Sequence, residues 1–133
     1  MDSSIKFIDS DPELFFNIML IACRKQPRLP VDIIHHITTH LECKSSYIEF
    51  VYHIIQRIEI DQIVLDSFVI KWFNLCKTGG TSKELNVMYI CKFLNKLLER
   101  SYFDVSSQRD EWKRYCEHFK GIEQVEEFRK VLD

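Results

Sequence analysis

Hydrophobic residues recur every three or four positions along nearly the whole chain, and no segment alternates as a β-strand would. Proline, glycine and Ser or Thr residues fall between these periodic segments, where helices begin and end. The pattern predicts helices at about 11–25, 30–42, 45–57, 61–77, 82–100, 108–120 and 122–132. We therefore expect an all-α fold, a compact bundle of about six to seven helices forming one domain over residues 1–133, with residues 1–9 as a flexible N-terminus.

The first helix is expected to begin at the sequence SDPE. Ser10 and Glu13 have the spacing of a capping box, and Pro12 fits the first turn, where a missing N–H costs nothing. Apolar residues cover nearly every side of residues 15–22. The pattern therefore predicts a helix without a solvent-exposed face, at the centre of the bundle.

The second helix follows a Leu-Pro pair and is amphipathic. Its aliphatic stripe comprises Ile33, Ile34, Ile37 and Leu41, and its opposite side comprises Asp32, His35, Thr39 and Glu42. Such a stripe is either a docking surface or part of the core. The core interpretation is favoured, because a chain of 133 residues can hardly leave a whole aliphatic stripe outside its own interior.

Composition indicates a globular protein and argues against nucleic acid as a partner. Apolar residues make up 46% of the chain, and the formal net charge is −2, so no overall positive field attracts phosphate groups. Lys92, Lys96 and Arg100 share one face of a predicted helix, but acidic neighbours dilute them. A solvated helix face is the favoured interpretation of these three residues.

Cysteine usage and hydropathy together predict an intracellular protein. The five cysteines are odd in number and widely spaced within apolar segments, as free cysteines in a core are. The chain opens without the pattern of a signal peptide, and its longest apolar run is about half of what spans a bilayer. We expect reduced cysteines, no membrane span and a cytoplasmic or nuclear location.

Metal binding and catalysis are both disfavoured by the sequence. His36, His40 and Cys43 could share one edge of a helix, but structural zinc sites take ligands from two separate elements, and no second ligand pair is present. The segment 77–83, KTGGTSK, lacks the strand and full spacing of a phosphate-binding loop and is interpreted as a turn between two helices. No catalytic motif is present, so we expect a protein that is not an enzyme and needs no metal or other cofactor.

The segment LPVDIIHHITTHL resembles the first helix of the F-box, the module that docks onto the Skp-type adaptor of cullin ubiquitin ligases. In that family the Leu-Pro pair enters the helix and the aliphatic residues pack in a groove of the adaptor. The resemblance implies partner-binding residues at the matching positions, which are Leu29, Pro30, Ile33, Ile34, Ile37 and Leu41.

The function predicted from the sequence is a non-enzymatic, intracellular protein–protein interaction domain. The specific hypothesis is a ubiquitin-ligase adaptor that binds another protein, with a cullin-ligase adaptor as the candidate partner. A viral Bcl-like helical inhibitor or scaffold and a small helical nucleic-acid binder are the alternatives. The pattern leaves the oligomeric state and the interacting helix face open.

Overall fold

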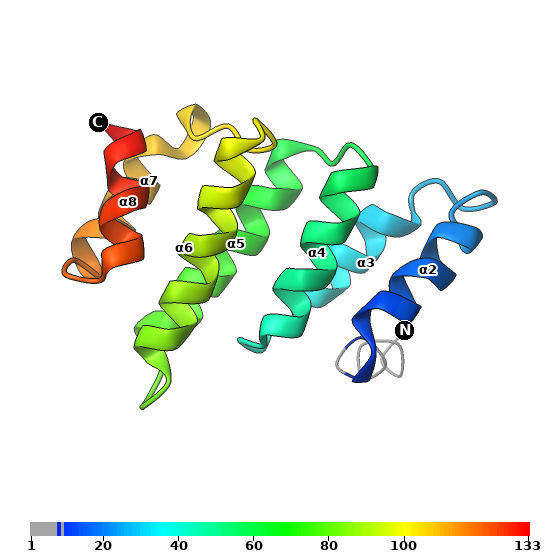
Figure 1. Ribbon diagram of the computed structural model, residues 1–133, viewed down its shortest axis with the longest axis horizontal. Coiled ribbons are helices and arrows are strands. Elements are labelled where there is room, and N and C mark those ends of the chain that lie inside the picture. The colour runs from blue at the N-terminus through cyan, green and yellow to red at the C-terminus, as the bar shows by residue number, and fades with distance from the viewer. Residues whose placement is uncertain (1–7, 9) are drawn as a thin grey trace. The chain divides into compact units, whose positions relative to one another are not determined.

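The computed structural model describes residue 8 and residues 10–133, and the described part of the chain contains seven α-helices, one short 3-10 helix and no strand (Figure 1). The helices are α2 (Pro12–Ala22), α3 (Leu29–Thr39), α4 (Ser45–Arg57), α5 (Gln62–Lys77), α6 (Lys83–Glu99), η1 (Ser106–Gln108), α7 (Arg109–His118) and α8 (Glu123–Leu132). The predicted all-α fold class is therefore confirmed.

The chain divides into two compact units, residues 1–71 and residues 72–133. The boundary falls within α5, so it does not coincide with a linker. The organisation as one domain remains a prediction. The flexible N-terminus predicted at residues 1–9 lies outside the described residues, apart from Ile8, whose side chain is fully buried.

Helix α2 begins at a different cap from the predicted one and has a solvent-exposed face. The Asp11 carboxylate, rather than the Ser10 hydroxyl, accepts a hydrogen bond from the Leu14 N–H, at 3.1 Å. The side of α2 that carries Leu14, Ile18 and Ile21 is exposed. The prediction that this helix has no solvent-exposed face is wrong, because α2 packs against α3 and α4 on one side only, where Phe16 and Met19 are buried.

The first unit is centred on α4, against which both α2 and α3 pack (Figure 1). The ring of Phe50 in α4 lies 5.2 Å from that of Phe15 and 6.3 Å from that of Phe16, measured between centroids. Phe50 is itself fully buried, and aromatic rings at such distances add to the stabilisation from burial. Aromatic contacts therefore join α2 to α4.

In the second unit α8 packs against α6 and α7 (Figure 1). The helical spacing predicts an apolar stripe of Ile122, Val125, Phe128 and Leu132. The last three are buried, and Ile122 at the N-cap is half-buried. The Tyr115 ring of α7 stacks on the Phe73 ring at the C-terminal end of α5, with centroids 4.6 Å apart. Aromatic residues therefore contribute to the interior of this unit.

Candidate partner-binding surface

The Leu-Pro helix forms as predicted, and its aliphatic stripe lies inside the first unit. Pro30 occupies the first turn of α3, where its missing N–H breaks no helical hydrogen bond. Of the six residues predicted to bind a partner, Pro30, Ile33, Ile34, Ile37 and Leu41 are buried, and Leu29 is half-buried. Their role in partner binding remains a prediction, and their side chains in this structure are part of the interior.

The opposite edge of α3 borders a groove of about 410 Å³. The residues that line it are Arg28, Val31, Asp32, His35 and Thr38 on the α3 side and Ile63, Val64 and Ser67 in the first turns of α5. Ile63 is the most exposed large hydrophobic residue in the described chain, with 78% of its surface accessible. An aliphatic side chain in this position beside an interhelical groove is the kind of surface that binds another protein.

The side chains of His36 and His40 contact one another on α3, with ring centroids 4.6 Å apart. In the described part of the chain no three His, Cys, Asp or Glu residues come together as a metal site would require. Cys43 lies beyond the end of α3, and none of the five cysteines forms a disulfide. The histidines that stand out in the sequence therefore form a ring pair rather than a set of convergent ligands.

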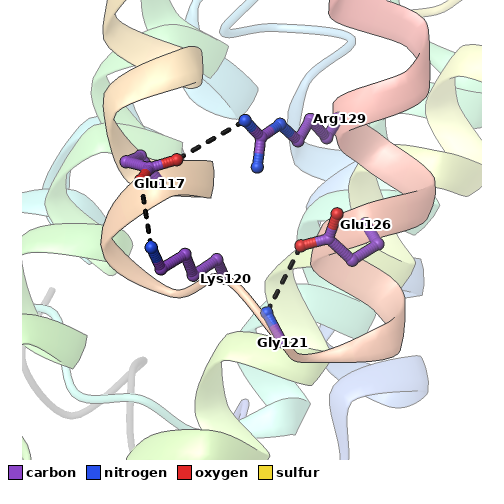
Figure 2. Close-up of polar contacts among 5 residues, drawn as sticks. All are labelled: Glu117, Lys120, Gly121, Glu126 and Arg129. Carbon is purple, nitrogen blue, oxygen red and sulfur yellow. Dashed lines mark hydrogen bonds and ion pairs between the residues drawn. The ribbon is translucent and has the colours of Figure 1, made fainter.

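The turn between α7 and α8 in the second unit carries a cluster of polar contacts, shown in Figure 2. The Glu117 carboxylate of α7 lies 3.3 Å from the Lys120 ammonium in the turn and 3.4 Å from the Arg129 guanidinium of α8, so it links α7 to the turn and to α8. Gly121 has a φ of 98°, which glycine adopts without strain, and its N–H donates to the Glu126 carboxylate at 3.3 Å. These exposed contacts span the turn between α7 and α8 and each contributes little to stability.

A second hollow, of about 550 Å³, lies beside this turn and includes part of the segment KTGGTSK. The ammonium groups of Lys77 and Lys83 lie over the rings of Tyr115 and Phe119, at 4.8 and 5.4 Å from the centroids. Such cation–π contacts cover buried aromatic rings at a surface. Both lysines therefore have a structural role at the turn between α5 and α6, in agreement with the interpretation of this segment as a turn.

The pKa shifts in the second unit follow from burial and from local hydrogen bonding. Burial raises the pKa of the Cys116 thiol to about 11 and raises that of Cys91 still further. The Ser106 hydroxyl and N–H both donate to the Asp104 carboxylate and lower its pKa. A thiol that stays protonated at neutral pH is a poor nucleophile, so neither of these two cysteines has the character of a catalytic residue.

In its described part this is a helical protein with exposed aliphatic residues along helix edges, a surface typical of proteins that bind other proteins. The chain is a member of the CCR4-NOT transcription complex subunit 11 family, whose sequence model matches residues 8–133. Comparisons with curated proteins and with solved structures gave no match.

Family membership corrects one prediction and supports the coarser part of another. The F-box identity suggested by LPVDIIHHITTHL is wrong, because the matching family is a different one and spans nearly the whole chain. A Pro-initiated helix with a buried aliphatic stripe satisfies the F-box pattern through ordinary core packing. The broader prediction of a protein–protein interaction role is confirmed, since the family's name is that of a subunit of a protein complex.

The sequence pattern missed the exposed aliphatic residues of the first unit. Leu14, Ile18 and Ile21 lie within a helix that is apolar on nearly every side, so the pattern gives no direction for the buried face. Ile63 lies among other apolar residues at the start of α5, so the sequence pattern does not show on which side of α5 the buried face lies. For α2, only the packing of α3 and α4 against it decides which face is buried and which is exposed.

Proposed function

We propose that this chain is a non-catalytic subunit of a CCR4-NOT-type complex and that it acts by binding other subunits. The observation that carries the proposal is the family match over residues 8–133. The helical fold of the described residues is consistent with it. The predicted cytoplasmic or nuclear location belongs to the same proposal, and no described helix is long and apolar enough to span a bilayer.

The groove between α3 and α5 is the proposed contact surface. Val31 and Val64 supply apolar walls, and Ile63 at the edge loses exposed surface when a partner side chain covers it. Arg28 and Asp32 provide charges of both signs, which set the orientation of a partner more than its affinity. The buried residues Ile33, Ile34 and Ile37 then contribute indirectly, because they hold the exposed edge of α3 in place.

Purification of the tagged chain from cells tests the proposed assembly. We expect CCR4-NOT subunits to co-purify in amounts comparable with the bait, as measured by quantitative mass spectrometry. A bait eluting without these subunits would contradict the proposed function.

A matched pair of variants tests the groove. Ile63→Glu places a charge at its edge, whereas Leu85→Glu places the same charge on a 47% exposed leucine of α6, in the other unit. We expect Ile63→Glu to reduce co-purification about tenfold and Leu85→Glu to leave it unchanged, because a charge in a desolvated contact is costly. Equal recovery with both variants would exclude the groove as the contact surface.

A further inference from the structure

The outer face of α2 carries three exposed aliphatic residues in a row. Leu14, Ile18 and Ile21 are spaced by four and then three positions, and they are 46%, 51% and 68% exposed. At about 3.6 residues per turn this spacing aligns the three side chains along the helix. The stripe lies opposite the buried residues Phe16 and Met19, so the packing of α2 against α3 and α4 leaves it uncovered.

Charges stand at both ends of the stripe. Exposed Glu13 precedes it, and exposed Arg24 follows it, directly after the C-cap residue Cys23, which keeps a helical conformation. Glu13 and Arg24 are about three turns apart and so lie along the same edge of the helix. Neither residue forms an ion pair among the described residues.

We infer that α2 is a self-association surface that pairs with α2 of a second copy of this chain in antiparallel orientation. A two-fold axis near Ile18 sets this residue against its own copy and brings Leu14 of each chain near Ile21 of the other. In an antiparallel helix pair the same edges of the two helices face one another. Glu13 of each chain then faces Arg24 of the other, so the stripe is complementary to itself in shape and in charge.

The size of the stripe predicts the strength of the association. One short helix from each copy covers less than the roughly 1,200 Å² of total buried surface that stable, specific interfaces reach. We therefore expect a reversible dimer that dissociates on dilution. The paired charges are solvent-exposed, so added salt weakens the dimer.

Sedimentation velocity of the purified chain over a wide concentration range tests the inference. We expect the wild-type chain to shift from monomer to dimer as concentration rises. Ile18→Glu should weaken dimerisation about tenfold or more, as the loss of a central interface residue does. Leu85→Glu, which alters a leucine of similar exposure in the other unit, should have no effect. A wild-type chain that remains monomeric at all concentrations would overturn the inference, as would an equal effect of both variants.

Charge reversal provides a second test that does not disturb the apolar stripe. Glu13→Lys and Arg24→Glu should each weaken the dimer, because each places two like charges opposite one another across the two-fold axis. The double variant should restore dimerisation, because the pairs are then opposite in sign again. A double variant weaker than both single variants would exclude the antiparallel arrangement.

This inference goes beyond the proposed function and is independent of it. The α2 variants alter self-association, whereas the variant Ile63→Glu alters binding of other subunits. Each set can therefore fail without the other. Circular dichroism of every variant serves as a control that its helices are retained.

Discussion

Trp72 donates its indole N–H to the backbone carbonyl of Asn86 at 2.8 Å, whereas the indole N–H of Trp112 has no hydrogen-bond partner among the described residues. Both side chains are fully buried. The second unit therefore contains one buried tryptophan whose indole N–H is hydrogen-bonded and one whose indole N–H is not. A buried polar group without a hydrogen-bond partner lowers stability.

This contrast predicts different effects of the same substitution. Trp72→Phe and Trp112→Phe remove equal volumes, but only the first removes a hydrogen bond. We expect Trp72→Phe to cost about 1 kcal/mol more in the free energy of unfolding than Trp112→Phe. Urea denaturation of both variants measures the difference. An equal or larger loss of unfolding free energy for Trp112→Phe would contradict the finding that only the Trp72 indole N–H is hydrogen-bonded.

The buried stripe of α3 predicts a large loss of stability on truncation. Ile37 is 1% exposed, so Ile37→Ala should lower the free energy of unfolding by about 2–5 kcal/mol, as a cavity in a packed core does. His35→Ala, on the exposed side of the same helix, serves as a control and should change stability by about 0.5 kcal/mol or less. Thermal and chemical denaturation measure both. An Ile37→Ala protein as stable as the control would show that this stripe is not core.

The cysteines are expected to react with a thiol reagent in two groups. Cys76, Cys91 and Cys116 are buried, whereas Cys23 and Cys43 are partly accessible. Burial also raises the pKa of Cys91 and Cys116, which lowers the fraction of reactive thiolate. Mass spectrometry of the native chain after alkylation should find Cys23 and Cys43 modified first. Rapid modification of Cys91 without unfolding would contradict its burial.

The Asp104 carboxylate predicts a contribution to stability that depends on pH. Its pKa is lowered in the folded chain because the Ser106 hydroxyl and N–H donate to it. A group with a lowered folded pKa stabilises the fold above its ordinary pKa, 3.8 for this carboxyl, and this stabilisation is lost as the pH falls through the folded value.

Comparison of Asp104→Asn with the wild type isolates this contribution. The variant should be less stable at neutral pH, and the difference should disappear as the pH is lowered below 3.8. Ser106→Ala, which removes the donated hydroxyl bond, should show the same direction and a smaller effect. A difference that is independent of pH would exclude the carboxylate as its source. Thermal denaturation across the acid range provides the measurement.

The periodicity of apolar residues was sufficient to predict every α-helix of the described residues within a few residues, but not the short 3-10 helix η1. A helix with a narrow stripe also reveals which of its sides is buried, and the burial of Val125, Phe128 and Leu132 in α8 follows their spacing. The sequence likewise placed Gly121 at the turn before α8, where the backbone takes a positive φ.

Local pattern did not determine which family the Leu-Pro helix belongs to. Pro30 and the isoleucines after it satisfy the requirements of a docking helix and of a core helix equally well, because both need an amphipathic helix that begins at a proline. The family match over residues 8–133 removed the F-box interpretation. The burial of the stripe depends on contacts of α3 with α2 and α4, which lie elsewhere in the chain.

The sequence by itself determined that the chain is helical, where its α-helices begin and end to within a few residues, and which helices have a single apolar side, because these depend on residues within a few turns of one another. Only the tertiary structure decided which side of α2 is exposed. Apolar residues surround that helix, so its buried face is chosen by the position of Phe50 in α4 and not by its own pattern. The same holds for Ile63, whose exposure beside the groove depends on where the first turns of α5 lie relative to α3.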